Sequence, residues 1–353
     1  MGPFELMNVT GLPIAYHSCN SLAERLGSFY APSETLARQV KAARPWDLAG
    51  EPDEGRFDEV ARRLLGVVFY VAAQMLDEDV ARLEDIDRGA KIGLRWRKGP
   101  FELMNDMTVP ESFELIREVC ARYGVSAPAS VARRLETGGP WPMEYVDYEV
   151  RDGVAWVVFN RPEAMNALNP TVMEQFAAAV DRALADEAAG AVVLSGAGGK
   201  AFVAGADINF FIERIEGDRF KEIYDFTAFG HEVLRRMETS PKRFVAAVDG
   251  FALGGGFEIA LACHAVVATP RSSFALPETG IGIYPGLGGM HRSARRVGVP
   301  LARWLVLCGE TVSATSAAEF GLVDHIAETA ALEKEAAVSY THLRAHETSL
   351  HLV

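Results

Sequence analysis

The strongest fold signal lies in residues 247–258, which read AVDGFALGGGFE in a chain of 353 residues. The apolar residues 244–248, which lead into this stretch, predict a buried strand, and the apolar residues 259–263 after it predict a buried helix. Three consecutive glycines (254–256) join the two, and glycine allows the backbone to lie close to a ligand. The amide of Gly255 is therefore expected at a helix N-terminus, where free N–H groups and the helix dipole favour negative charge.

Two glutamates are placed where they can act together. Glu258 precedes the buried run, and no basic residue lies near it in the sequence. A carboxylate in such a place is costly unless it has partners or a task. Glu278 follows Pro277 at the predicted end of a strand, and two carboxylates that hold a water between them can divide general acid and general base work. We predict a catalytic pair, with a merely paired buried acid at Glu258 as the alternative.

The region around these glutamates alternates between strands and helices. Asp152-Gly153 lies between two apolar runs and is typical of a tight hairpin. Asn169-Pro170 is expected to cap and begin a helix. Because strands and helices alternate from residue 148 to residue 323, we expect an α/β domain whose sheet is covered by helices.

The first part of the chain predicts helices and contains a repeat. The string GPFELMN occupies residues 2–8 and again 99–105, which indicates an internal duplication of a helical module. Asp58 is expected to cap a helix, and the stretch GGPWP at 138–142 breaks the helical pattern, so we place the domain boundary there. The positions of that helix expected to face the core are Val60, Leu64, Leu65, Val68, Val71 and Met75.

Composition argues against several classes of protein. Lysine and arginine total 35 against 48 aspartates and glutamates, a formal charge of −13, so the chain lacks the positive charge that attracts nucleic acid or an anionic membrane. The four cysteines lie far apart, which argues against a zinc or redox centre and favours a reducing compartment. The longest apolar run is far shorter than the ~20 residues of a membrane span, and no secretory signal is visible. We expect a cytoplasmic protein that binds no metal, nucleic acid or membrane.

Four motifs then occur in a characteristic order. They are NRP at 160–162 with NAL at 166–168, AGAD at 204–207, ALGGG at 252–256 and PE at 277–278. Each is weak alone, but together the segment from about residue 149 to residue 328 resembles the enoyl-CoA hydratase/isomerase (crotonase) family. The resemblance implies the α/β fold of that family, a spiral of ββα units, over residues 148–330.

The resemblance also implies roles for individual residues. The amides of Ala206 and Gly255 would form an oxyanion hole for the thioester carbonyl of an acyl-CoA. Glu258 would activate the water that adds at the β-carbon, and Glu278 would supply the proton at the α-carbon. Coenzyme A enters as part of the substrate, and no cofactor or metal is implied. The other residues expected along the substrate are Ala164, Ala204, Gly205, Asp207, Ile208, Gly254, Pro277, Gly288 and Gly289, with Asp207 also expected to cap or order its loop.

Residues 1–140 resemble the duplicated all-α C-terminal domain of 3-hydroxyacyl-CoA dehydrogenases, and residues 141–147 are expected to be a linker. We interpret the chain as a fragment of a bifunctional fatty-acid oxidation protein that forms a homo-oligomer when intact. Its first repeat is expected to be truncated and the crotonase C-terminal helices to be missing. The NAD-binding half is also expected to be absent, because no GxGxxG motif is followed by an acid about twenty residues later. Dehydrogenase activity is therefore not expected.

Residues 338–353 resemble one translated frame of a transposase sequencing adapter and are interpreted as an artefact, with a real C-terminal segment as the alternative. The leading functional hypothesis is a lyase that adds water, syn, to a 2-enoyl-CoA to give a 3-hydroxyacyl-CoA in β-oxidation. Two hypotheses stay open beside it. One is an isomerase that converts a 3-enoyl-CoA to a 2-enoyl-CoA, and the other is a catalytically silent fragment that acts only as an interaction module.

Overall fold

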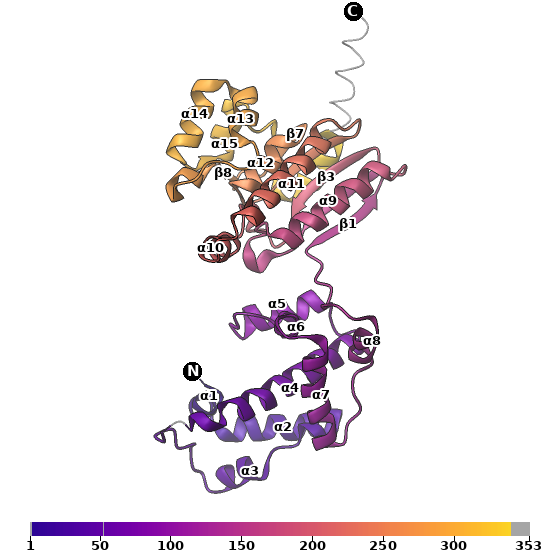
Figure 1. Ribbon diagram of the computed structural model, residues 1–353, viewed down its shortest axis with the longest axis vertical. Helices are drawn as coiled ribbons and strands as arrows, with labels where there is room; N and C mark the ends of the chain where they lie inside the picture. The colour runs from indigo at the N-terminus through magenta and orange to yellow at the C-terminus, as the bar shows by residue number, and fades with distance from the viewer. Residues whose placement is uncertain (1, 52, 340–353) are drawn as a thin grey trace, which may run out of the picture. The chain divides into compact units, whose positions relative to one another are not determined.

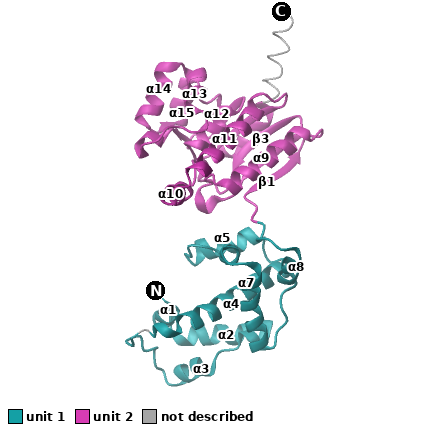
Figure 2. Ribbon diagram, viewed as in Figure 1, with its two compact units in different colours: residues 1–142 teal, residues 143–353 magenta. Residues whose placement is uncertain are grey.

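The computed structural model describes residues 2–51 and 53–339. It divides into two compact units, residues 1–142 and 143–353 (Figure 2). The segment interpreted as an adapter-derived tail lies outside the described residues from residue 340 onward.

The first unit is built from helices (Figure 1). Two short 3-10 helices, η1 (Ser28–Tyr30) and η2 (Glu54–Arg56), accompany the α-helices. The α-helices are α1 (Pro3–Thr10), α2 (Leu12–Leu26), α3 (Glu34–Lys41), α4 (Phe57–Asp77), α5 (Leu83–Gly93), α6 (Pro100–Asp106), α7 (Val109–Tyr123) and α8 (Ala129–Thr137).

The duplicated sequence folds twice into the same local structure. In the first copy, Asn8 on α1 donates its amide to the carbonyl of Trp46 at 2.8 Å and accepts the Trp46 N–H at 2.7 Å. In the second copy, Asn105 on α6 makes the same two bonds to the backbone of Trp141, at 3.0 and 2.7 Å. Equivalent side chains therefore close equivalent loops in both copies.

The two copies differ in how deeply they are buried. Phe4 packs edge-on against Trp46 with ring centroids 5.0 Å apart, and Phe101 packs against Trp141 at 4.9 Å in the same arrangement. Phe4 is nevertheless 50% exposed, whereas Phe101 is fully buried. The difference arises because α4 and α5 cover α6, while α1 has its main contact with α2.

A buried acid from outside the repeat stabilises the start of α6. Asp87 on α5 is fully buried and accepts the backbone N–H groups of Phe101 and Glu102 at 2.8 and 2.9 Å. Burial raises the pKa of Asp87 to about 6, and these two hydrogen bonds oppose the increase. Gly99 is required beside it, because a Cβ there would lie 2.2 Å from Asp87 Cγ.

Two expectations for α4 are wrong. The helix begins at Phe57 directly after η2, so Asp58 lies in its first turn and is not the cap. Val60 and Leu64 are 44% and 60% exposed. The buried face of α4 instead contains Gly66, Phe69, Tyr70, Ala72 and Ala73. Gly66 shows why, since a Cβ there would lie 2.7 Å from the backbone oxygen of Leu115, so α7 approaches α4 on this face.

The second unit contains two sheets. The six-stranded sheet has the order β1-β2-β3-β5-β7-β10, and the four-stranded sheet has the order β4-β6-β8-β9. The strands are β1 (Val146–Arg151), β2 (Val154–Phe159), β3 (Ala191–Gly196), β4 (Ala201–Ala204), β5 (Arg243–Val248), β6 (Phe251–Leu253), β7 (Ala265–Ala268), β8 (Ser273–Ala275), β9 (Val312–Ser313) and β10 (His325–Ile326).

The predicted hairpin is confirmed. Strands β1 and β2 pair antiparallel, with Arg151 opposite Val154. Asp152 and Gly153 between them have φ angles of 51° and 75°, as a two-residue turn of this kind requires. The adjoining β2, β3, β5 and β7 are parallel.

The fold class is confirmed as a spiral. Along the chain, β3 is followed by β4, β5 by β6 and β7 by β8, and each pair contributes one strand to each sheet before a helical segment returns the chain. The helices of this unit are α9 (Pro170–Ala185), α10 (Ile208–Glu216), α11 (Phe220–Glu238), α12 (Gly255–Ala262), α13 (Gly289–Val297), α14 (Val299–Cys308) and α15 (Ala314–Phe320). The 3-10 helices are η3 (Pro162–Ala164), η4 (Pro277–Ile281) and η5 (Thr329–Ala331).

Helices cover both faces of the larger sheet. Asn169 caps α9 by accepting the Val172 N–H at 2.9 Å. On one face of this sheet α9 packs on β1 and β2, while α12 packs on β4 and β6 of the four-stranded sheet. On the other face, Leu332 and Ala336 from the helical residues 332–339 join a second apolar cluster with Val154 and Trp156. The layers place α12, and with it Glu258, in the interior of the unit.

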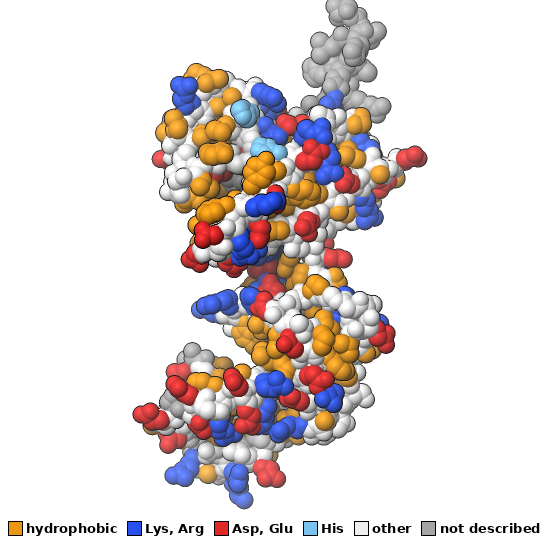
Figure 3. Space-filling view, in the orientation of Figure 1, with side chains coloured by type: hydrophobic (Ala, Val, Ile, Leu, Met, Phe, Trp, Pro, Cys, Tyr) orange, Lys and Arg blue, Asp and Glu red, His pale blue; other side chains and the backbone are white. Residues whose placement is uncertain are grey.

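Charged side chains of both signs are interspersed over the surface of each unit on the face drawn in Figure 3. Among the helices of the described ranges, none is both long enough and apolar enough to cross a membrane.

Candidate active site

The glycine-rich stretch joins β6 to α12 as the sequence predicts. Gly254 is the N-cap with φ 48° and ψ −124°, a backbone conformation that side chains disfavour. Gly255 is the first residue of α12. Its N–H therefore belongs to the first helical turn, whose N–H groups have no carbonyl acceptor four residues earlier within the helix.

The loop after β4 lies beside this helix start. Leu168 donates its N–H to Gly205 at 2.9 Å and accepts the Asp207 N–H at 2.7 Å. Because bonding groups alternate along an extended strand, the N–H of the intervening Ala206 faces away from Leu168. A Cβ on Gly254 would lie 3.7 Å from Gly205 Cα, so the two loops are adjacent.

Glu258 is buried on α12, with 1% of its surface exposed. Its Oε1 accepts the N–H groups of Leu287 and Gly289 at 2.8 and 2.7 Å. Its pKa is raised to about 7: burial is the largest cause and the charge of Glu278 adds to it, while the two amides and the Arg292 guanidinium oppose the increase.

Glu278 lies on η4, three residues after β8 ends at Ala275. A Cβ on Gly254 would lie 2.8 Å from Glu278 Oε1, so this carboxyl is next to the glycine loop. Its Oε2 is buried and has no hydrogen-bond partner among the residues that the structure describes. Burial raises its pKa. The negative charge of Glu278 also raises the pKa of Glu258.

Gly289 packs against the acid directly, and Gly288 precedes it in the same turn. A Cβ on Gly289 would lie 2.9 Å from Glu258 Cγ and 3.1 Å from its Oε1. Gly288 has φ 92° and is the N-cap of α13. The backbone of this turn therefore donates hydrogen bonds to Glu258 at a place where a side chain on residue 289 would displace the Glu258 carboxylate.

Other predicted site residues lie around the same two loops. Asp207 caps α10 by accepting the Asn209 N–H at 3.2 Å and forms an ion pair with Arg161 at 2.9 Å, with both partners 16% exposed. Its two oxygens are thus held by the protein, and Ile208, the next residue, is 59% exposed. The Arg161 side chain also donates to the Ala167 carbonyl at 3.4 Å.

The remaining predicted contacts are backbone segments. Ala204 donates its N–H to the Met165 carbonyl at 3.1 Å, which places the end of η3, at Ala164, beside the end of β4. Pro277 begins η4 and is exposed. Within the described ranges, no group of three or more His, Cys, Asp or Glu side chains is arranged to hold a metal ion.

Sequence reasoning missed the basic residue near Glu258. Arg292 on α13 is 7% exposed and forms a two-bond ion pair with Glu238, at 2.9 and 2.8 Å. It also donates to the Leu287 carbonyl. The signal was present as an arginine three positions after Gly289, but only the folded chain brings it beside the glutamate.

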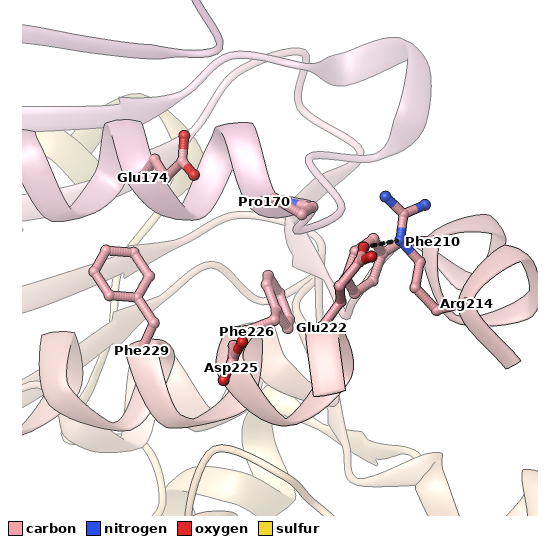
Figure 4. A pocket seen from close by; sticks show the side chains of 8 residues that line it. All are labelled: Pro170, Glu174, Phe210, Arg214, Glu222, Asp225, Phe226 and Phe229. Carbon is pink, nitrogen blue, oxygen red and sulfur yellow. Dashed lines mark hydrogen bonds and ion pairs between the residues drawn. The ribbon is translucent and has the colours of Figure 1, made fainter. Parts of the chain in front are cut away.

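A separate pocket of about 380 Å³ lies among α9, α10 and α11 (Figure 4). Three phenylalanines form its walls, and Arg214 at its edge forms an ion pair with Glu222 at 3.1 Å. The predicted site residues do not line it. The full set of lining residues is Pro170, Glu174, Phe210, Arg214, Glu222, Asp225, Phe226 and Phe229.

Comparison with known proteins identifies the family. The Enoyl-CoA hydratase/isomerase family matches residues 149–352, and the 3-hydroxyacyl-CoA dehydrogenase C-terminal domain matches residues 60–139. The chain is 42% identical over 177 residues to a short-chain-enoyl-CoA hydratase of Clostridium acetobutylicum, covering 50% of this chain and 66% of that protein. It is 38% identical over 185 residues to a crotonyl-CoA hydratase of Syntrophomonas wolfei, covering 52% of this chain and 70% of the relative.

Longer proteins and solved structures agree with this assignment. A peroxisomal fatty acid beta-oxidation multifunctional protein of Oryza sativa is 41% identical over 177 residues, which are 49% of this chain and 23% of that protein. The crystal structure of an enoyl-CoA hydratase from Bacillus anthracis superposes with a TM-score of 0.53 at 30% identity, covering 57% of this chain and 77% of the other. The chain therefore belongs to the enoyl-CoA hydratase/isomerase family, and it carries a 3-hydroxyacyl-CoA dehydrogenase C-terminal domain at residues 60–139.

Proposed function

We propose that the second unit is an enoyl-CoA hydratase, a lyase that adds water to a 2-enoyl-CoA and releases a 3-hydroxyacyl-CoA. The observation that carries this proposal is the meeting of two glutamates, the buried Glu258 and the half-buried Glu278, at Gly254 of the glycine loop: Gly254 accepts the Glu258 backbone N–H at 2.9 Å, and a Cβ on it would lie 2.8 Å from Glu278 Oε1. The names of the related hydratases support the same reaction.

The thioester carbonyl would bind between two backbone donors. The N–H of Gly255 belongs to the first turn of α12, and the N–H of Ala206 faces away from Leu168 in the neighbouring loop. Negative charge develops on the thioester oxygen when the double bond is attacked, and preorganised donors stabilise it. One such donor typically contributes ~3 kcal/mol to lowering the barrier.

The two glutamates would divide the proton transfers. Glu258 takes a proton from water as the water oxygen bonds to the β-carbon, and Glu278 gives a proton to the α-carbon. A pKa of about 7 keeps a useful fraction of Glu258 ionised at neutral pH. The raised pKa of Glu278 favours its acid form. Delivery of both parts of water from one side of the substrate makes the addition syn.

The substrate would extend along the backbone segments that surround these acids. The coenzyme A moiety lies against Ala164 and residues 204–206 in this proposal, with Ile208 exposed beside them. Gly254, Pro277 and the turn at residues 288–289 enclose the acyl end. Addition of water transfers no electrons to a cofactor, so coenzyme A takes part only as the carrier of the substrate.

We further propose that the chain is part of a fusion between a 3-hydroxyacyl-CoA dehydrogenase and a hydratase, with the first unit contributing the helical dehydrogenase domain. The match at residues 60–139 and the similarity to multifunctional relatives support this. The four unpaired cysteines fit a reducing compartment, for which we propose the cytoplasm. A homo-oligomer is the expected form of the intact protein.

The test is to follow the fate of crotonyl-CoA with the full chain. Loss of the enoyl thioester absorbance and appearance of 3-hydroxybutyryl-CoA by chromatography support the hydratase. A 3-enoyl-CoA that is converted to the 2-enoyl isomer while crotonyl-CoA stays unhydrated identifies an isomerase. Absence of both reactions, with no thermal stabilisation by coenzyme A, contradicts the proposed function and identifies a silent fragment.

A further inference from the structure

The turn at residues 287–289, which donates hydrogen bonds to Glu258, is itself bonded to Arg292. The N–H groups of Leu287 and Gly289 donate to Glu258, and the carbonyl of Leu287 accepts a hydrogen bond from the Arg292 guanidinium. The carbonyl of Gly288 accepts the Arg292 backbone N–H at 3.1 Å. Each peptide of the turn is thus bonded to Glu258 on one side or to Arg292 on the other.

The packing of Arg292 leaves it little freedom. Its side chain is 8% exposed, and Glu238 at the end of α11 engages its Nε and Nη2 at 2.9 and 2.8 Å. A Cβ on Gly288 would lie 2.4 Å from Arg292 Nη1, so the guanidinium fills the space beneath the turn. Arginine suits such a place, because its planar group donates in several fixed directions at once.

A purely structural ion pair would not need this arrangement. Burying an ion pair is weak evidence for stability, because desolvation offsets much of the attraction. Here the guanidinium has two partners. It forms an ion pair with Glu238, and it donates to the Leu287 carbonyl, which belongs to the same peptide group as the Gly288 N–H. Its positive charge also favours the ionised form of Glu258.

We infer that Arg292, anchored by Glu238, is a positioning residue for Glu258, which keeps the turn at residues 287–289 in the geometry that aims the carboxylate at the reacting water. This inference rests on the proposed hydratase function. It adds to that function a residue that does not touch the substrate and that acts through the backbone of the turn.

The titratable and charged groups around Glu258 and its turn lie on three elements. Glu278 on η4 and Arg292 on α13 act on its ionisation. His231 on α11 lies near the turn, because a Cβ on Gly288 would be 3.5 Å from its Cε1. Glu238, also on α11, is 28% exposed and is paired with Arg292. The pH profile of the reaction therefore reports on the ionisation of Glu258, and loss of the Arg292 charge should change that ionisation.

The experiment compares R292Q, R292K and the control R296Q in crotonyl-CoA hydration across pH. Arg296 is a matched control, because it lies on the same α13, is 17% exposed and forms an ion pair with Asp324 at 2.9 Å. We expect R292Q to lower kcat roughly tenfold or more with little change in KM, since the base is misplaced. The acidic limb of kcat/KM should move up by about one pH unit as the guanidinium charge is lost.

R292K, which keeps the charge but loses the planar set of donors, should lower kcat while its acidic limb stays close to that of the wild type. If R292Q does not fold, R292K carries the test, and an unchanged kcat in R292K overturns the inference. An unchanged profile in folded R292Q, or equal effects in R296Q, also overturns it. A wild-type chain without hydratase activity contradicts the proposed function instead, so the two failures are distinguishable.

Discussion

Gly289 donates its N–H to Glu258 Oε1 at 2.7 Å, and the same glycine has no room for a side chain, since a Cβ would lie 2.9 Å from Glu258 Cγ. The hydrogen bond and the close approach depend on each other. A glycine lets the backbone reach a carboxylate that is buried on the neighbouring helix. The position of the proposed base is therefore set by the backbone of another segment.

The first prediction concerns this glycine. We expect G289A to lower kcat roughly 100-fold, because the methyl group displaces the Glu258 carboxylate, and small misplacements of a reacting group have effects of this size. G286A, one residue before the turn, is the control, since its Cβ would meet only Thr227 Cγ2 at an ordinary 3.7 Å. Steady-state kinetics with crotonyl-CoA measures both. Equal activities of the two variants would contradict the packing argument.

The second prediction concerns the two acids. E258Q and E278Q should each lower kcat by about 10²- to 10⁴-fold, the range typical of a lost general acid or base. Glutamine keeps the size of the side chain but cannot exchange the proton. E319Q, a change at an exposed acid on α15, should retain the activity of the wild type. Turnover close to that of the wild type in both E258Q and E278Q would reject their assignment.

The third prediction is the pH dependence of the reaction. Glu258 must be ionised to accept a proton from water, and its pKa is about 7 because of burial. The value of kcat/KM should therefore decrease as the pH is lowered through about 7, with a tenfold loss per pH unit below it. A profile that stays level down to pH 5 would show that an ordinary carboxylate, or another group, is the base.

The fourth prediction links the same acid to stability. The pKa of Glu258 is higher in the folded chain, at about 7, than the ordinary value of 4.5 for this side chain. The folded state then holds a proton that the unfolded state has released between these pH values, so stability decreases as the pH rises from 4.5 to 7. E258Q removes this effect and should be more stable than the wild type at pH 8, by up to about 3 kcal/mol. Urea unfolding at pH 5 and pH 8 checks it, and stability differences that are equal at the two pH values would contradict it.

The fifth prediction uses the two copies of the helical repeat. F101A should destabilise the first unit by about 3–5 kcal/mol, because the fully buried ring leaves a cavity. F4A, at the equivalent but half-exposed position, should cost far less, on the order of 1 kcal/mol. Circular dichroism during urea unfolding measures the difference. Equal losses for the two variants would show that the repeats are packed alike in solution.

Features that depend on neighbouring residues were predictable. The hairpin at Asp152-Gly153 and the helix start at Asn169-Pro170 follow from turn and capping chemistry, which involves only a few consecutive residues. The helix start at Gly255 follows in the same way. The buried face of α4 was not predictable in this way, because its apolar residues are too continuous to indicate one face. The close packing of α7 against Gly66 determines which face is buried.

The sequence by itself determined the alternation of strands and helices, the duplicated helical module, and the glutamates and glycines available for the chemistry. Only the tertiary structure decided the surroundings of Glu258, whose hydrogen-bond donors Leu287 and Gly289 are separated from it by 29 and 31 residues. The buried Arg292 near that turn is equally a product of folding. The physical reason is that local backbone preferences act within a few residues, whereas burial and charge, which set a pKa, come from segments that meet only when the chain folds.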